Sequence, residues 1–175
     1  MTVALRPKLQ SLFDEYTAFH RHPVNRLTHK IAIPLIVFHV FAMLDWLKVG
    51  PSIHPALSAP FNVVTVSVGQ VAWALAIAYY AWLNVPLAAA MALLTAPCFP
   101  LGMLTPAPVV VAIAVVGWGV QLAGHSVWEK NRPAFLKNMQ QALIGPLFFL
   151  ATATGVYRPA YGAPASSDAA ARPAS

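Results

Sequence analysis

Charged residues are scarce in this sequence, and its middle has none. Asp, Glu, Lys and Arg make up 9% of the 175 residues, and none occurs in the eighty residues from Val49 to Trp128. A soluble domain has about 25% charged residues and needs them on its surface to stay in solution, so this composition excludes one. Because a helix needs about 20 apolar residues to cross a bilayer, the uncharged section predicts about three membrane spans joined by short turns.

Cysteine and acidic residues are also few. Cys98 is the single cysteine, which excludes an intramolecular disulfide. The net charge of +6 would suit nucleic acid if the basic residues formed one patch. Instead, up to Lys137, every basic residue except Lys48 precedes the first apolar run or follows the fourth. This asymmetry is the positive-inside pattern, so we assign the basic residues to topology and to anionic membrane lipid, and expect no nucleic acid.

The hydropathy pattern predicts an all-α fold, a polytopic integral membrane bundle of four spans. Their approximate ranges are 31–47, 61–83, 87–104 and 109–128, and the run 143–157 is either a short fifth span or a re-entrant piece. The first apolar run begins only after Lys30, so no cleavable signal peptide is expected. Residues 1–157 then form one membrane-embedded domain, followed by a tail, 158–175, whose Ala, Pro and Ser content predicts disorder.

An interfacial amphipathic helix is expected over residues 6–21. Its apolar side chains recur at helical spacing, and His20 lies four residues after Tyr16 on the same face. Pro23 then interrupts the backbone direction, which allows His20 and His29 to converge. Because four spans return the chain to the side of the N-terminus, both histidines should lie at the same membrane face as His125. The charge bias makes this the cytoplasmic face.

Three polar side chains follow one another at intervals of four where the last long apolar run ends. Gln121, His125 and Glu129 would share one face of an α-helix. Together with His20 and His29, this set suits a divalent transition metal, because imidazole favours iron, zinc, copper or nickel. A histidine and carboxylate set that leaves coordination positions open would suit non-haem Fe(II) and dioxygen.

Other polar residues near these histidines could assist such a site. Asn25, Gln121 and Glu129 could orient the imidazoles or add a ligand. A substrate carboxylate at the headgroup level could be held by the four nearby cations, which are Arg21, Arg26, Lys130 and Arg132.

Structural explanations for the same residues remain open on spacing alone. A single histidine near a membrane boundary is more often a hydrogen-bonding group than a ligand, although polar groups inside a span tend to be functional. We expect His39 to pack between helices, and topology alone explains the basic residues as well as substrate binding does. Two other classes stay open: a non-catalytic membrane lipid-binding or scaffold protein, and a haem protein with two axial histidines.

Two motifs resemble the small membrane family of 2-hydroxy fatty acid dioxygenases, which perform α-oxidation. The first reads Tyr16-x3-His20, then Pro23-x-Asn25-x3-His29-x4-Pro34. The second reads Trp118-x2-Gln121-x2-Gly124-His125-x3-Glu129-Lys130-x-Arg132-Pro133-Ala134, followed by Asn138 and Gln141. The resemblance covers roughly residues 10–150, and the apolar stretch between the motifs is not diagnostic.

The resemblance implies a non-haem Fe(II) enzyme that uses dioxygen and no 2-oxoglutarate. A 2-hydroxy fatty acid would yield the fatty acid one carbon shorter, with the carboxyl carbon lost as carbon dioxide. The family's essential histidines correspond to His20, His29 and His125, with Glu129 and Asn25 as further ligands or orienting groups. The membrane would be the inner membrane of a bacterium, which the Ala-rich composition favours, or the endoplasmic reticulum of a eukaryote. The sequence indicates no oligomeric state.

Overall fold

The computed structural model describes residues 5–49, 66–130 and 138–161. Within these ranges the predicted all-α class is confirmed, with one antiparallel pair of two-residue strands, β1 (Lys48–Val49) and β2 (Val66–Ser67), as the exception. The helices, in chain order, are α1 (Pro7–Ala18), α2 (Pro23–Asp45), α3 (Val68–Leu83), α4 (Val85–Thr95), α5 (Cys98–Leu104), α6 (Ala107–Ala123), the π-helix η2 (Gly124–Glu129) and α7 (Gln140–Ala153).

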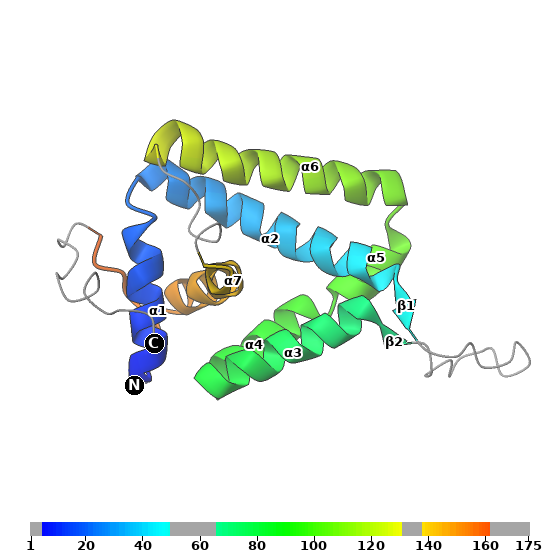
Figure 1. The fold of residues 1–175 in the computed structure, drawn as a ribbon, viewed down its shortest axis with the longest axis horizontal. Coiled ribbons are helices and arrows are strands. Elements are labelled where there is room, and N and C mark those ends of the chain that lie inside the picture. Colours follow the sequence, from blue (N-terminus) through cyan, green and yellow to red (C-terminus); the bar gives the residue numbers. More distant parts are fainter. Residues whose placement is uncertain (1–4, 50–65, 131–137, 162–175) are drawn as a thin grey trace, which may run out of the picture.

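The helices form two arms that diverge from one end of the molecule. One arm is α2 with α6 along it, and the other is α3 with α4 (Figure 1). The arms meet near α5 and the β1–β2 pair, and α1 lies across the opposite, open end. Between the arms runs α7, which is seen almost end-on in this view and contacts both α1 and α2. The start of α2 and the end of α6 therefore meet beside α1.

Three helical stretches in the described ranges are long and apolar enough to cross a membrane. They are Pro23–Asp45, the α4–α5 stretch Val85–Leu104, and the α6–η2 stretch Ala107–Glu129. With 16 and 14 residues, α3 and α7 are shorter than the roughly 20 residues that a straight span needs. The membrane character is confirmed, whereas the expected second span, 61–83, is represented by the shorter α3, and residues 61–65 lie outside the described ranges.

The N-terminal helix forms as predicted, but protein covers its apolar face. Leu9 and Phe13 are fully buried, and the Phe13 ring meets Phe148 of α7 edge-on at 5.6 Å between centroids. At its start, Arg6 donates a hydrogen bond of 2.7 Å to the carbonyl of Trp82, at the end of α3. The helix runs across the direction of α2 and α6, as an interfacial helix would, and α7 supplies the apolar partner that lipid was expected to supply.

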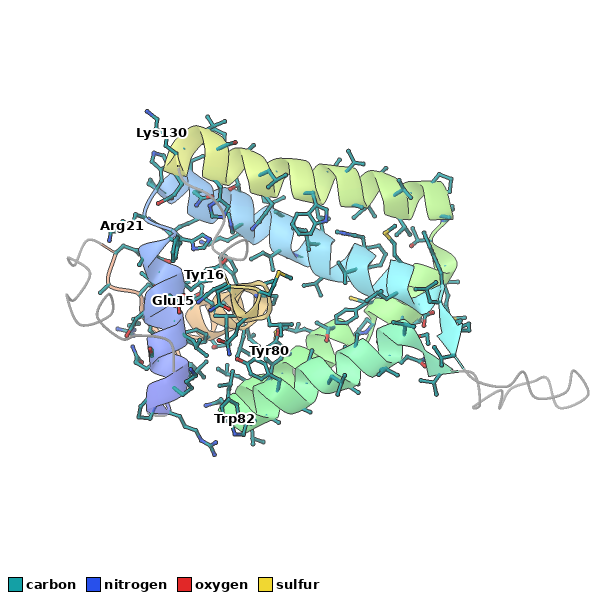
Figure 2. All side chains as sticks on the ribbon, in the orientation of Figure 1. Glu15, Tyr16, Arg21, Tyr80, Trp82 and Lys130 are labelled. Atoms are coloured by element: carbon teal, nitrogen blue, oxygen red, sulfur yellow. The ribbon has the colours of Figure 1, made fainter. Side chains whose placement is uncertain are left out.

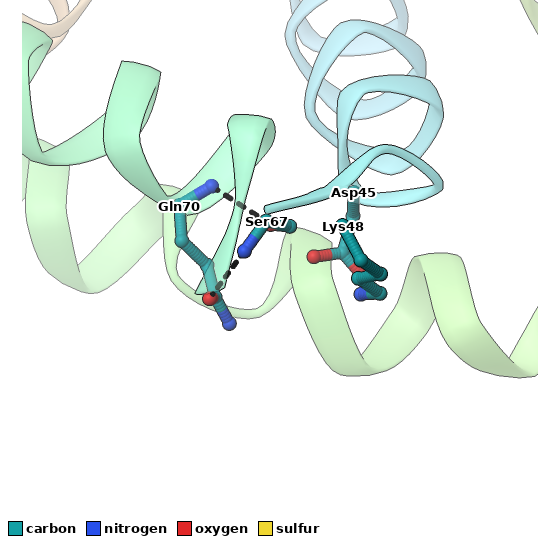
Figure 3. Close-up of polar contacts among 4 residues, drawn as sticks. All are labelled: Asp45, Lys48, Ser67 and Gln70. Atoms are coloured by element: carbon teal, nitrogen blue, oxygen red, sulfur yellow. Dashed lines mark hydrogen bonds and ion pairs between the residues drawn. The ribbon is translucent and has the colours of Figure 1, made fainter. Parts of the chain in front are cut away.

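A capping box defines the residue at which α3 begins. The Ser67 hydroxyl accepts from the backbone N–H of Gln70 at 3.0 Å, and the Gln70 side chain accepts from the Ser67 backbone at 3.1 Å (Figure 3). Such reciprocal bonds satisfy the free N–H groups of a helix start, so the helix begins at Val68. Nearby, Lys48 pairs with Asp45 at 3.0 Å where α2 ends.

Candidate metal centre

Three histidines from three segments converge beside α1, where α2 begins and α6 ends. His20 lies in the turn between α1 and α2, His29 on the second turn of α2, and His125 in η2. Their ring centroids are 4.6–5.1 Å apart, and each ring offers a nitrogen within 4.8 Å of the others. All three side chains are at most 3% exposed. This group could hold one metal ion, shielded from bulk water.

Backbone carbonyls orient two of the three rings. His20 Nδ1 lies 2.7 Å from the carbonyl of Tyr16, and His29 Nδ1 lies 2.8 Å from that of Asn25. A carbonyl only accepts hydrogen bonds, so in each neutral ring Nδ1 holds the proton and Nε2 carries the lone pair. Histidines that bind metals usually donate their other N–H in this way.

The distance between the Nε2 atoms of His29 and His125 also suits one ion. His29 Nε2 lies 3.0 Å from His125 Nε2, and two nitrogens each about 2.0–2.1 Å from one metal, at about a right angle, would be about 2.9 Å apart. Burial lowers the pKa of His20 to about 3. That imidazole is therefore neutral at physiological pH, as a metal ligand must be.

Glu129 holds the turn that contains His20. Its Oε1 accepts from the backbone N–H of Arg21 at 2.9 Å, and its Oε2 accepts from the backbone of His22 and from the amide of Asn25, both at 3.0 Å. The carboxylate thus ties the end of η2 to the turn and to the start of α2. It does not belong to the group of converging ligand atoms, which contains only the histidines among the described residues.

The π-helix explains why Glu129 faces the turn instead of the histidines. Gln121 lies on the face expected, with its Nε2 2.7 Å from His29 Nε2. From Gly124 onward the chain forms wider turns with i→i+5 bonds, so Glu129 no longer stacks directly beyond His125. The four-residue spacing in the sequence assumed an α-helix throughout, and nothing in that spacing reveals the wider turn.

A glycine lets η2 approach α2 closely enough for the histidines to meet. A Cβ on Gly124 would collide with the side chains of Thr28 and Asn25. The absence of a side chain therefore sets the distance between these backbones, and hence between His29 and His125.

The predicted cations lie at this end of the molecule but outside its interior. Arg21 and Lys130 are exposed and point outward (Figure 2). Arg26 donates to the carbonyl of Arg21 and lies 3.9 Å from the ring centroid of Tyr161. Arg132 lies outside the described residues. Their positions would suit contact with anionic groups at the membrane surface.

An apolar cavity of about 460 Å³ leads away from the histidines, between the two arms. Ligand pockets commonly have volumes of about 300–1,000 Å³. His20, His125 and Gln121 line one part of it, and Phe41 and Trp73 line another. Most other lining residues are aliphatic, so the cavity suits a long apolar molecule whose polar end meets the histidines.

Two residues at this site had no role assigned from the sequence. Gln141 of α7 is 2% exposed and lines the cavity, and among the described residues neither of its amide atoms has a hydrogen-bond partner. Buried polar groups without partners are rare, so this amide is available to a ligand. The Tyr16 ring stacks on His20 at 3.9 Å, and burial raises the pKa of Tyr16, which keeps the phenol protonated. Both residues occur in the two sequence motifs described above, and this was the signal that could have identified them.

The histidine assigned to helix packing has that role. His39 Nδ1 lies 2.9 Å from the carbonyl of Leu35, and Trp118 of α6 donates to its Nε2 at 3.2 Å. Both nitrogens of His39 are thus used between α2 and α6, and it is separate from the cluster of three.

The whole described site lies within the part of this chain that matches one protein family. The model of a family described as 2-hydroxy-palmitic acid dioxygenase Mpo1-like matches residues 7–157. The curated 2-hydroxy-palmitic acid dioxygenase MPO1 of Saccharomyces cerevisiae is 31% identical over 144 residues, which cover 81% of this chain and 76% of the yeast protein. No solved structure matches the chain.

Proposed function

This chain belongs to the Mpo1-like family of 2-hydroxy-palmitic acid dioxygenases, and we propose that it is an Fe(II)-dependent dioxygenase of 2-hydroxy fatty acids. One molecule each of hydroxy acid and dioxygen would give the fatty acid one carbon shorter, carbon dioxide and water. The bond between C1 and C2 breaks, C2 becomes the new carboxyl carbon, and dioxygen is reduced. The hydroxy acid itself supplies the electrons, so no 2-oxoglutarate is needed.

The observation that supports this proposal most strongly is the convergence of three buried imidazoles at one end of an apolar cavity. His20, His29 and His125 would hold the metal through Nε2 and leave other coordination positions open. Bound Fe(II) would supply the one-electron chemistry that dioxygen requires to react with an organic acid. Glu129 and Asn25 would keep the His20 turn in place, and Tyr16 would keep the His20 ring in its plane.

The chain's own polar groups would position the acid. Gln121 and Gln141 both line the cavity. Within the part of the chain that the structure describes, Oε1 of the first and both amide atoms of the second have no hydrogen-bond partner. Amides can donate to a carboxylate and accept from a 2-hydroxyl group, so these two residues would orient C1 and C2 beside the histidines. The aliphatic lining would hold the acyl chain and exclude water.

The surface cations would attract the anionic substrate to this end of the protein. Arg21, Arg26 and Lys130 lie there, and Arg132 follows shortly in the sequence. Since basic residues favour the cytoplasmic side, the site would face the cytoplasm, in the inner membrane of a bacterium or the endoplasmic reticulum of a eukaryote. Substrate would reach it from the surrounding membrane lipid.

The test begins with anaerobic purification in detergent with Fe(II), elemental analysis and an absorption spectrum. The protein is then given 2-hydroxypalmitate in air, and pentadecanoate is sought by mass spectrometry. We expect about one iron per chain, no Soret band and the shortened acid. A Soret band would indicate haem instead, and iron without any shortened product would contradict the proposed reaction.

Histidine variants locate the metal. His20→Ala, His29→Ala and His125→Ala should each lose iron and product. His22→Asn is a matched control, because His22 caps α2 by accepting from Val24 N at 3.2 Å and asparagine can cap a helix equally well. Full iron content in a variant lacking both His20 and His125 would refute the site.

A further inference from the structure

An aromatic cluster lines the cavity at the end away from the histidines, where the two arms meet (Figure 1). Trp73 of α3 donates from its indole N–H to the Thr95 hydroxyl at 2.8 Å, and that hydroxyl donates to the Met91 carbonyl at 2.6 Å. The Phe99 ring lies 6.2 Å from Trp73 and 5.8 Å from Phe41, between centroids. These contacts join α2, α3, α4 and α5 where the two arms meet, so the indole is held from several sides.

One face of α2 runs along the cavity from the metal centre to this cluster. Its lining residues recur at helical spacing: Ile33, Ile36, Val37, Val40 and Phe41. Phe41 is twelve residues after His29, which corresponds to about 18 Å along a helix with a rise of about 1.5 Å per residue. His29 does not itself line the cavity, but its ring lies 4.6 Å from that of His20, which does, so this length approximates the distance from the histidines to Phe41.

This length corresponds to a certain number of carbon atoms in an extended acyl chain. Single C–C bonds of about 1.5 Å at tetrahedral angles advance an extended alkyl chain by about 1.3 Å each, so about 18 Å accommodates about fourteen carbons. With C1 and C2 beside the histidines, the cavity holds an acid of about sixteen carbons.

We propose that Trp73, held by Thr95 and packed beside Phe41, is the stop that sets the longest acyl chain this protein accepts. The inference rests on the proposed function only in taking a 2-hydroxy fatty acid as the ligand. Trp73 is the largest side chain in this cluster, and it comes from the arm opposite α2. Shortening it would lengthen the cavity without touching the histidines.

A binding experiment tests the stop independently of turnover. A 2-hydroxy acid of sixteen carbons with bromine on its last carbon is added to the protein in lipid nanodiscs, and tryptophan fluorescence is recorded. Bromine quenches an indole on contact, and excess unbrominated 2-hydroxypalmitate should reverse only the quenching that occurs in the cavity. We expect the reversible quenching to fall at least twofold in Trp73→Phe and to persist in Trp82→Phe, because Trp82 is exposed at the far end of α3. Equal reversible quenching in the two variants, or none in the native protein, would overturn the proposal.

A chain-length profile provides the second test. Native protein, Trp73→Ala, Trp73→Leu and the control Leu75→Ala, an exposed position on α3, are given 2-hydroxy acids of twelve to twenty carbons. We expect kcat/KM of the native protein and control to fall beyond about sixteen carbons, and the Trp73 variants to accept acids about two to four carbons longer. An unchanged profile in a Trp73 variant that keeps its iron and its turnover of short acids would refute the stop. Failure of the native protein to convert any of the acids would instead refute the reaction. The quenching result would still decide whether Trp73 limits the length of the bound acyl chain.

Discussion

Replacing Glu129 with glutamine is expected to weaken iron binding about 10- to 100-fold while all three imidazoles remain able to bind. The carboxylate accepts three hydrogen bonds of 2.9–3.0 Å, two from the backbone of the turn that contains His20 and one from Asn25. Glutamine keeps one oxygen, but its amide nitrogen must face at least one of these donors. A hydrogen bond to a charged group contributes about 1.5–3 kcal/mol, and about 1.4 kcal/mol corresponds to tenfold in affinity. Since Glu129 is only partly buried, the loss of one such bond gives the stated range.

The assay is an anaerobic titration of Fe(II) against a competing chelator, with X-ray absorption at saturating iron to report the ligand set. Glu15→Gln, an exposed position on α1, is the matched control for the change in charge and should leave the affinity unchanged. The reasoning predicts weaker binding in Glu129→Gln with the same histidine ligands. If the variant loses iron as completely as His125→Ala, or if its saturated spectrum lacks one oxygen ligand, then Glu129 binds the metal and the turn-holding explanation is wrong.

Three further substitutions test the packing and the cavity. Gly124→Ala should push η2 from α2, cost about 1–3 kcal/mol of stability and lower both Tm and iron affinity. Gly119→Ala should do neither, because no described atom lies within 4 Å of its added Cβ, and equal Tm values for the two variants would contradict the close-approach argument. Gln141→Leu should retain iron but raise KM for 2-hydroxypalmitate about tenfold, through loss of about one hydrogen bond, and an unchanged KM would remove Gln141 from substrate binding. Phe13→Ala should cost about 3–5 kcal/mol, measured as a fall in Tm, because its ring is fully buried between α1 and α7; a change below 1 kcal/mol would mean that α1 is only loosely docked.

The convergence of the histidines was predictable because it follows from topology. An uncharged middle section and a one-sided distribution of basic residues predict that the chain returns to its starting face, and Pro23 predicts the turn that directs His20 and His29 together. The fold class follows from composition for the same reason. These features depend on long-range averages of the sequence, which change little when an individual helix shifts by a few residues.

Features that depend on a single turn or on distant packing were not predictable. The π-helix after Gly124 depends on close contact with α2, and it alters the direction of Glu129 without any change in residue spacing. The place of Gln141 depends on α7 entering between the arms, where it packs against α1, α2 and α4. A short apolar helix with a proline inside, as α7 has at Pro146, does not indicate whether lipid or protein will cover it.

The contact between His29 and His125 joins residues 96 positions apart in the chain, and this has a consequence for biogenesis. His20 and His29 emerge from the ribosome early, while η2 follows only after α6 has been made. A partly inserted chain thus presents two imidazoles, and the three-histidine centre cannot exist before the last long apolar helix is in the bilayer. Loading of a metal would therefore report that α6 and η2 are in place, and would distinguish chains that contain η2 from chains truncated before it, while α7 still follows in the sequence.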